Sequence, residues 1–245
     1  PTTIRVADPN ADCRDALAAD FGVATFAEAP AAVEGTSTWL FAVKPQVMRQ
    51  VCESLSAAAQ ATQPLVVSIA AGITSTQLER WLGDSSAVVR SMPNTPALLG
   101  AGVTGLFANA HVDAHGRQLA QALLSSAGQT VWIDDEARMD AVTGVSGSGP
   151  AYVFLLAEAM EAAAIKEGLA PDAARTLVLQ TVLGAARMLT ESDVAPEELR
   201  RRVTSPNGTT QAAVETFQAG GLETLVAAAI HAATVRGQEL SVAND

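Results

Sequence analysis

The sequence lacks three features that would define its class at once: a long apolar run, a basic stripe and a secretion signal. No apolar run reaches the roughly 18 residues that a transmembrane helix requires. The opening PTTIRVADPN has neither the charged nor the apolar region of a signal peptide. The 245-residue chain carries a net charge of −11, which argues against a nucleic-acid partner. We therefore expect a cytoplasmic protein that binds neither membranes nor nucleic acid.

Cysteine, histidine and lysine are all scarce. Cys13 and Cys52 have neither metal-ligand nor CxxC spacing, which is typical of reduced thiols. The three histidines are scattered along the chain, so we expect no histidine metal site. Only two lysines occur, Lys44 and Lys166, and each can be considered by its own position.

The first half of the sequence alternates between short apolar runs and helical patterns. This alternation is typical of βαβ units, which build a parallel sheet with helices on both faces. The runs that predict strands are IRVAD, TWLFAVK, LVVSIAA, AVVRSMP, GVTGLFA and QTVWID.

From Glu136 onward the sequence turns into long segments rich in Ala and Leu, which predict an all-α region. Two of them, VFLLAEAMEAAA and TLVAAAIHAA, are apolar nearly all round, so they must be buried on more than one side. We infer an obligate helical dimer. The alternative is one compact bundle packed on the first domain.

A glycine-rich phosphate-binding turn is missing from the start. A doubly wound domain that binds a dinucleotide normally opens with a strand and a G-x-G-x-x-G turn. IRVAD therefore looks like the second strand of such a domain, ending in Asp8. We expect about thirty residues, one βα unit, to precede Pro1 in the gene product.

Candidate binding residues follow three of the predicted strands. Ligands of open α/β sheets bind at the carboxyl ends of the strands, and AVKPQ ends one that we expect to be central. Lys44 could meet a phosphate or ribose there, or be an ordinary surface lysine. The small residues of SIAAG allow close approach of a ligand or of a helix. The residues concerned are Ala42, Val43, Lys44 and Pro45; Ala70, Ala71 and Gly72; and Met92, Pro93, Asn94 and Thr95.

Two further stretches contain more glycine or hydroxyl-bearing residues than a simple turn needs. TGVSGSGPAYVF places Ser146 and Gly147 just before a long helix, whose first amides could face a ligand; a tight helix–helix junction is the alternative. VTSPNGTTQ surrounds a Pro-Asn-Gly turn with hydroxyls. Thr209 or Thr210 would cap the helix, and the amides at its start would bind a carboxylate. An elaborate cap without a ligand is the alternative.

Taken together and in this order, these stretches resemble pyrroline-5-carboxylate reductase, the family that completes proline biosynthesis. LRRRVTSPNGTTQAAVETF matches the signature region of the family. AVKP, SIAAG, MPNTPA and DAVTGVSGSGPAY match its other characteristic segments at the right spacing. The resemblance covers essentially all of residues 1–245.

The resemblance implies an α/β Rossmann-like domain over 1–134, with its first βα unit missing, that binds NADPH or NADH. It also implies an all-α dimerisation and substrate-binding domain over 135–245. The assembly would be a homodimer with interlocked C-terminal helices, which many members extend to a decamer. No metal is implied.

The resemblance also assigns roles to residues. The segments 42–45, 70–72 and 92–95, with Ser146 and Gly147, would bind the cofactor. The substrate would be held by Ser205, Asn207, Gly208, Thr209 and Thr210. Hydride transfer to the C=N carbon of 1-pyrroline-5-carboxylate would give L-proline, with the hydroxyl of Thr210 orienting the ring nitrogen.

Two other functions are compatible with this organisation. A β-hydroxyacid dehydrogenase relative would place a catalytic lysine about one turn into the long helix, where this sequence has Tyr152 to Leu155 and where Lys166 is far away. A non-catalytic nucleotide-binding protein would share the fold. The complete hydroxyl-rich loop argues against the second possibility.

Overall fold

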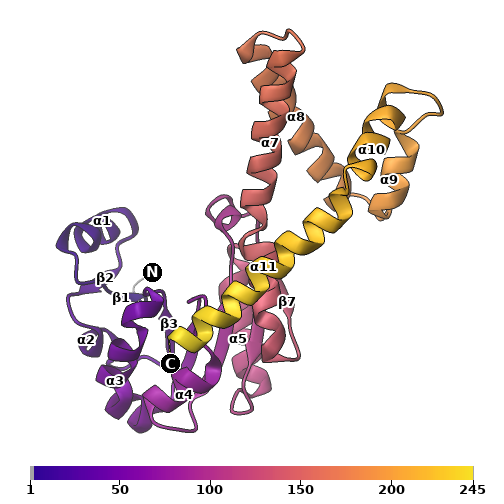
Figure 1. The fold of residues 1–245 in the computed structure, drawn as a ribbon. Helices are drawn as coiled ribbons and strands as arrows, with labels where there is room; N and C mark the ends of the chain where they lie inside the picture. The colour runs from indigo at the N-terminus through magenta and orange to yellow at the C-terminus, as the bar shows by residue number, and fades with distance from the viewer. Residues whose placement is uncertain (1–2, 245) are drawn as a thin grey trace. The chain divides into compact units, whose positions relative to one another are not determined.

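The structure is a computed structural model that describes residues 3–244 of the chain. Two compact units make it up: Pro1–Gly147 with Ala233–Asp245, and Ser148–Ala232 (Figure 1). The last helix, α11 (Leu222–Ala243), contributes residues to both. Among the described residues, no helix is both long and apolar enough to cross a membrane.

The first unit is built on two sheets whose strands alternate with helices. A pair of strands, β1 and β2, forms one parallel sheet, and five strands form the other in the order β3-β4-β5-β6-β7. The strands are β1 (Arg5–Ala7), β2 (Ala24–Phe26), β3 (Thr38–Phe41), β4 (Leu65–Ser68), β5 (Ala87–Met92), β6 (Gly102–Ala108) and β7 (Gly128–Trp132). The helices are α1 (Ala11–Phe21), α2 (Ala29–Val33), α3 (Pro45–Thr62), α4 (Ser75–Leu82), α5 (Ala114–Ser125) and α6 (Met139–Val142). Three short turns complete the unit: the 3₁₀ turns η1 (Thr95–Leu99) and η2 (Glu136–Arg138) and the π-helical turn η3 (Thr143–Gly147).

Two expectations about the sheet are wrong. Strand β6 runs antiparallel to β5, although β3, β4 and β5 are parallel to one another. The connection from β5 to β6 holds only η1, and a parallel connection needs a crossover of about a dozen residues or more. Strand β3 is not central but lies at the edge of the five-stranded sheet.

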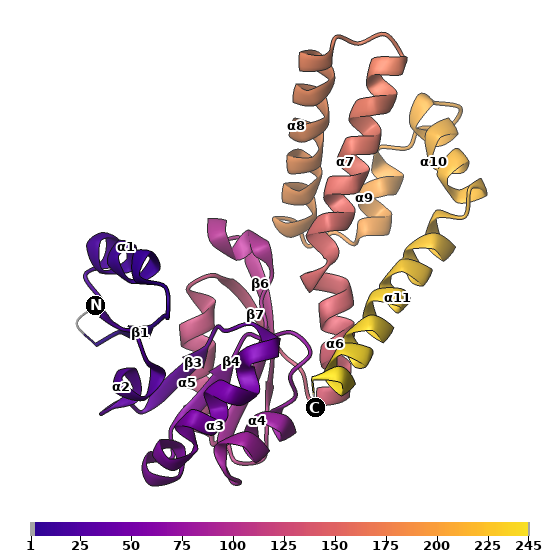
Figure 2. The same cartoon turned by 60° about the vertical axis from the view of Figure 1, so that its left-hand side comes forward.

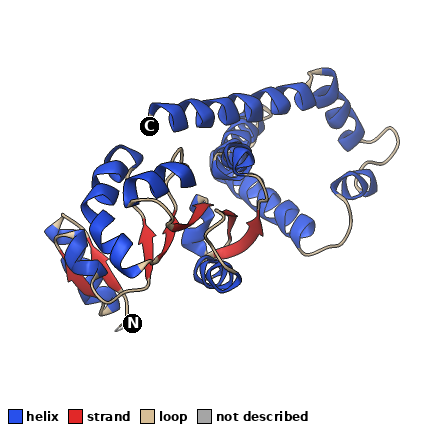
Figure 3. Ribbon diagram, turned by 90° about the horizontal axis from the view of Figure 1, so that it is seen from below, coloured by secondary structure: helices blue, strands red, loops and turns tan. Residues whose placement is uncertain are grey.

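Helices cover both faces of the five-stranded sheet, as the sequence predicts (Figure 3). Neighbouring residues of a strand point to opposite faces, so Val66 of β4 packs in one core and Val67 in the other. The first core includes Met48 of α3 and Leu78 of α4, whereas the second includes Leu124 of α5. Each fully buried side chain of this kind contributes about 1.5–3 kcal/mol of hydrophobic stabilisation.

Helix ends follow their sequence signals closely in this unit. Thr74 and Gln77 form a capping box at the start of α4, and Gly83 ends that helix with φ 96°. Asp113 caps α5 by accepting a hydrogen bond from the amide of Gly116 at 2.7 Å. These side chains satisfy backbone N–H groups that a helix start leaves without partners.

The second unit is entirely helical, which confirms the all-α prediction for this part of the chain. Its helices are α7 (Gly149–Lys166), α8 (Pro171–Thr190), α9 (Pro196–Arg202), α10 (Thr209–Ala219) and the first part of α11. Helices α7 and α8 lie side by side as a hairpin (Figure 2). Within this unit, every residue of which is described, only Ala174 and Val178 are buried. A single copy of the unit therefore has almost no core of its own.

Candidate functional site

Three of the predicted binding segments meet at one edge of the five-stranded sheet. Strands β3, β4 and β5 are parallel neighbours, so their carboxyl ends lie at the same edge. The segment 42–45 follows β3 directly, 70–72 follows β4 after one intervening residue, and 92–95 begins with the last residue of β5. The first unit thus brings most of the predicted cofactor residues together.

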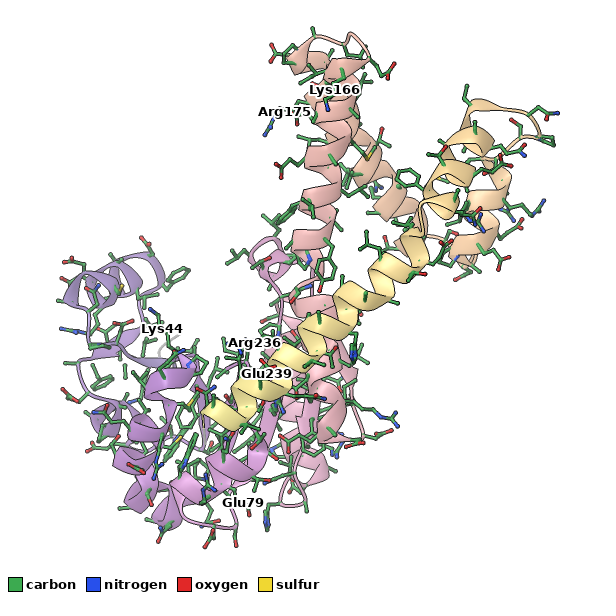
Figure 4. The ribbon with its side chains drawn as sticks, in the orientation of Figure 1. Lys44, Glu79, Lys166, Arg175, Arg236 and Glu239 are labelled. Atoms are coloured by element: carbon green, nitrogen blue, oxygen red, sulfur yellow. The ribbon has the colours of Figure 1, made fainter. Side chains whose placement is uncertain are left out.

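At the end of β3, Lys44 takes the N-cap position of α3 and Pro45 the first helical position. The backbone of Lys44 is extended, with φ −62° and ψ 144°, and its side chain is exposed (Figure 4). Ala42 is exposed, whereas Val43 packs against the core. This turn presents an exposed cation and a small residue at the sheet edge, which suits an anionic ligand.

At the end of β4, the close approach that small residues permit is made by helix α11. Gly72 has φ 68°, and a Cβ there would lie 3.2 Å from the Cβ of Leu240. The amide of Asn244 donates to the carbonyl of Gly72 at 3.2 Å. Ala70 is buried, and Ala71 is half-buried. Helix packing, the alternative considered from the sequence, explains Gly72.

At the end of β5, the segment 92–95 contacts the predicted glycine-rich stretch. The Asn94 amide Nδ2 donates to the carbonyl of Ser146 at 3.2 Å. A Cβ on Gly147 would lie 2.6 Å from the Cε of Met92, so a side chain there would displace the end of the Met92 side chain. The structure therefore joins four predicted cofactor residues that lie about fifty positions apart in sequence.

The glycine-rich stretch is not the open helix start that the sequence predicts. Residues 139–147 are already helical, as α6 followed by the π-helical turn η3. The hydroxyl of Ser146 donates to the carbonyl of Val142 at 2.9 Å, and that of Thr143 to Met139 at 3.1 Å. Because these residues continue a helix, they do not present a free row of amides to a ligand.

A buried cluster of charged side chains from β5, η2 and α6 was not predicted from the sequence. Arg90 of β5 donates to Asp140 at 2.9 Å and lies 3.5 Å from Glu136. The Glu136 carboxylate also accepts the amide and the hydroxyl of Ser75, both at 2.6 Å. Arg90 and Asp140 are both buried. An arginine in the middle of a buried strand is the signal that could have revealed this cluster, because a buried charge needs a partner.

The hydroxyl-rich loop lies in the second unit, between α9 and α10. Asn207 has a left-handed backbone, with φ 59°, and the amide of Gly208 donates to the carbonyl of Ser205 at 3.1 Å. A Cβ on Gly208 would lie 2.7 Å from the hydroxyl oxygen of Ser205, so a side chain there would displace that hydroxyl. The turn is therefore tight and keeps Ser205 against the start of α10.

The loop hydroxyls do not cap the helix, contrary to the expectation for Thr209 or Thr210. Gly208 is the N-cap residue, and it has no side chain with which to form the capping hydrogen bond. In the described part of the chain, the hydroxyls of Ser205, Thr209 and Thr210 form no hydrogen bond. These three hydroxyls therefore give no support to the interpretation of the loop as an over-built cap of α10, whereas the Thr204 hydroxyl donates to the carbonyl of Arg200 at 2.7 Å in the last turn of α9.

Gln211 holds the turn, although it was not among the residues predicted from the sequence. Its Oε1 accepts the amide of Asn207 at 2.7 Å, and its Nε2 donates to Glu215 at 2.7 Å. A Gln three residues after the N-cap belongs to the capping-box pattern. That pattern was the available signal. Here, however, the Gln211 side chain accepts from the amide of Asn207, the residue before the N-cap Gly208, and not from the N-cap itself.

The basic run before the loop, residues 200–202 at the end of α9, is a solvated helix face. Glu198 of α9 accepts hydrogen bonds from Arg201 at 2.6 and 2.7 Å and from Arg202 at 2.9 Å. The Arg201 and Arg202 guanidinium groups lower the pKa of the Glu198 carboxyl. The side chains of Arg201 and Arg202 are exposed, and that of Glu198 is partly exposed. Because both guanidinium groups are paired with Glu198, this run does not form a basic binding surface.

The remaining candidates are accounted for by their positions. Lys166 is the last residue of α7, next to the turn that leads to Arg175 of α8 (Figure 4). It is thus far from the first turn of α7, where a hydroxyacid dehydrogenase would need a lysine. Burial raises the pKa of the Cys52 thiol to about 12, whereas Cys13 is exposed. Within residues 3–244, no cluster of three or more acidic, His or Cys side chains has metal-binding geometry.

Two family models match the chain in the order of its two parts. Residues 1–72 match the family described as NADP oxidoreductase coenzyme F420-dependent. Residues 136–240 match the family described as pyrroline-5-carboxylate reductase dimerisation. The second match contains the hydroxyl-rich loop.

Relatives and solved structures agree with these matches. The chain is 52% identical to the pyrroline-5-carboxylate reductase of Pseudomonas aeruginosa, over 97% of this chain and 87% of the relative. It is 44% identical to the enzyme of the same name from Haemophilus influenzae, with the same coverage of both chains. The solved structure of a pyrroline-5-carboxylate reductase from Coxiella burnetii has a TM-score of 0.93 at 40% identity, over 97% of this chain and 88% of that one. The chain belongs to the pyrroline-5-carboxylate reductase family.

Proposed function

We propose that the protein reduces 1-pyrroline-5-carboxylate to L-proline with NADPH or NADH, the last step of proline biosynthesis. Members of its family are NAD(P)H-dependent oxidoreductases. The solved structure of the Plasmodium falciparum relative, 26% identical over 97% of this chain and 87% of that chain with a TM-score of 0.84, has NADP bound. The observation that carries the proposal is the loop Ser205–Thr210, whose three hydroxyls have no partner within the described chain.

The loop is suited to a carboxylate without any basic side chain. The amides of Thr209 and Thr210 are the first two of α10, and the first amides of a helix have no partner within it. They also lie at the positive end of the helix dipole, which favours an anion. The Ser205 hydroxyl, held against Gly208, adds a further donor to the same turn. We assign substrate binding to Ser205, Asn207, Gly208, Thr209 and Thr210.

The sheet edge is suited to the cofactor. Lys44 offers an exposed cation, and Ala42 beside it is exposed as well. Such edges are where open α/β sheets bind nucleotides. We assign cofactor binding to Ala42, Val43, Lys44 and Pro45; Ala70, Ala71 and Gly72; Met92, Pro93, Asn94 and Thr95; and Ser146 and Gly147.

When bound, the cofactor supplies a hydride to the C=N carbon of the substrate. The chain supplies placement. The loop fixes the carboxylate, and the hydroxyl of Thr210 orients the ring nitrogen and holds its proton. An iminium accepts hydride readily, so a strong protein acid is not required. Most of the rate enhancement would then come from holding the substrate and the cofactor at the right distance and orientation.

The functional assembly that we propose is a homodimer with interlocked C-terminal helices, with a decamer as its possible extension. Its support is the family match of residues 136–240 and the nearly complete exposure of the second unit. Large apolar side chains that are exposed there include Phe154, Leu155, Leu177, Leu183, Phe217 and Leu225. A second copy would bury them, because soluble proteins rarely leave so large an apolar surface uncovered. The proposed domains remain 1–134 and 135–245, and the proposed location is the cytoplasm.

The experiment is a side-by-side assay of NADPH and NADH oxidation by the full-length protein with racemic pyrroline-5-carboxylate. Oxidation that depends on the substrate, with proline as the product, supports the proposal. The ratio of the two rates gives the coenzyme preference. A folded dimer that oxidises neither coenzyme would show that the loop binds another carboxylate and that the chemistry differs.

A further inference from the structure

Every second residue of the extended segment 90–94 contacts the helical segment 139–147, which belongs to the same unit. Arg90, Met92 and Asn94 follow one another at every second residue, so their side chains leave the same face of the segment. Arg90 bonds Asp140, Met92 lies against Gly147, and Asn94 bonds Ser146. Since Asn94 is itself extended, with φ −130° and ψ 165°, the strand direction continues beyond the end of β5.

Asn94 is the contact at the sheet edge, and both ends of its amide are engaged. Its Oδ1 accepts the amide of Val103, at the start of β6, at 3.0 Å. Its Nδ2 donates to the carbonyl of Ser146, in η3, at 3.2 Å. The side chain is half-buried. One residue thus fixes the spacing of three segments, namely the end of β5, the start of β6 and the π-helical turn.

The π-helical turn needs such an anchor. A π turn inserts an extra residue into a helix, is rare, and is found frequently at functional sites. Two glycines allow its neighbourhood to pack closely: Gly147 lies under Met92, and Gly105 of β6 lies under Val142 of α6. Packing alone does not fix the direction of a carbonyl, whereas the Asn94 hydrogen bond does so for Ser146.

We propose that Asn94 is a positioning residue, which acts on the cofactor by fixing Ser146 and Gly147 at the cofactor edge. This inference rests on the proposed function, in which Ser146 and Gly147 bind NADPH or NADH. It refines the assignment of Asn94 to the cofactor site: because its amide is committed to Val103 and Ser146, Asn94 acts on the cofactor through these contacts and not as a direct ligand.

The test uses Asn94→Asp in the full-length protein. Aspartate keeps the oxygen that accepts from Val103 but replaces the donor by a second oxygen, which repels the carbonyl of Ser146. The dissociation constant of NADPH, measured by its fluorescence, should rise by about fivefold to tenfold, the effect of one lost hydrogen bond. The midpoint of thermal unfolding should fall by a few degrees at most.

The same chain offers a matched control at the other end of the β5–β6 pair. Asn109 accepts the amide of Val88 at 3.1 Å and donates to the carbonyl of Ser86 at 2.9 Å. Asn109→Asp removes the same kind of donor from a half-buried asparagine far along the strand from the cofactor edge. It should lower the unfolding temperature and leave the dissociation constant of NADPH unchanged.

The outcomes separate the possibilities. A weaker affinity for NADPH in Asn94→Asp alone supports the positioning role. An unchanged affinity in that variant, or an equal loss in Asn109→Asp, overturns it. If Asn94→Asp does not fold, Asn94→Ser removes the contact with Ser146 without adding a charge and is judged by the same affinity. Wild-type protein that binds neither coenzyme would overturn the proposed function, and this inference with it.

Discussion

The substitution Thr210→Val tests the candidate substrate loop directly. The two side chains have nearly the same shape, so the change removes one hydroxyl and little else. Thr210 is the second residue of α10, is half-buried, and forms no side-chain hydrogen bond among residues 3–244. The folded chain therefore has no contact of this hydroxyl to lose.

The expected magnitudes follow from that position. The free energy of unfolding should change by no more than about 0.5 kcal/mol, as for other substitutions without a structural partner. Turnover should fall by about a hundredfold, or about 2.7 kcal/mol in activation free energy, if the hydroxyl orients the ring nitrogen and its proton. The Michaelis constant for the substrate should change less than turnover, because the carboxylate is held by other groups of the loop.

Thr216→Val is a matched control on the same helix. The hydroxyl of Thr216 donates to the carbonyl of Ala212 at 2.8 Å, and the residue is exposed. The identical chemical change there should leave turnover at the wild-type value. Both variants would be measured by coenzyme oxidation with pyrroline-5-carboxylate and by urea unfolding.

Unchanged turnover in Thr210→Val would refute the assigned role. Equal losses in the two variants would also refute it, because the effect would then come from the helix and not from the loop. A loss of turnover with a matching loss of stability would show that the hydroxyl has a structural role.

Three further predictions concern the first unit. Arg90→Ala leaves the carboxylate of Asp140 buried without its partner, so urea unfolding should show a loss of about 3–5 kcal/mol; a loss below 1 kcal/mol would mean that water reaches the site. In the native protein, a thiol reagent should modify exposed Cys13 alone, and Cys52 should react only after unfolding. The pKa of Cys52 is raised from 9.0 to about 12 on folding, so the stability linked to this thiol is complete below pH 9 and is lost as the pH rises toward 12. An unfolding free energy that stays constant over that range would contradict the burial of the thiol.

The strands of the first unit could be predicted because each is a short apolar run bounded by turn residues. The direction of β6 was missed, although its signal was present. Only nine positions, 93–101, separate β5 from β6, which is too short for the crossover that parallel strands require. Connection length therefore had to be considered together with the strand pattern.

The candidate site was predictable as segments but not as contacts. The carboxyl ends of β3, β4 and β5 meet because parallel strands share an edge, a rule that needs no coordinates. The bonds of Asn94 could not be foreseen, since Val103 and Ser146 lie nine and fifty-two positions away. Gly147 was interpreted as part of a helix start that faces a ligand and Gly208 as part of a turn, whereas in the structure each lies against one side chain, that of Met92 or of Ser205.

The composition of the loop connects its geometry with the chemistry that we propose. Residues 203–210 contain hydroxyls, backbone amides and one carboxamide, and no side chain that ionises near neutral pH. Such groups can hold a carboxylate and orient a ring nitrogen, but they cannot act as a strong acid. A cyclic imine does not need one, because it is basic enough to arrive protonated. The requirement that remains is placement, which rigid turns provide: Gly208 holds Ser205, and Gln211 holds Asn207 in its left-handed conformation. On the proposed function, the reaction explains the hydroxyls of Ser205, Thr209 and Thr210, whereas the fourth hydroxyl beside the turn, that of Thr204, donates to the carbonyl of Arg200 at 2.7 Å and secures the end of α9.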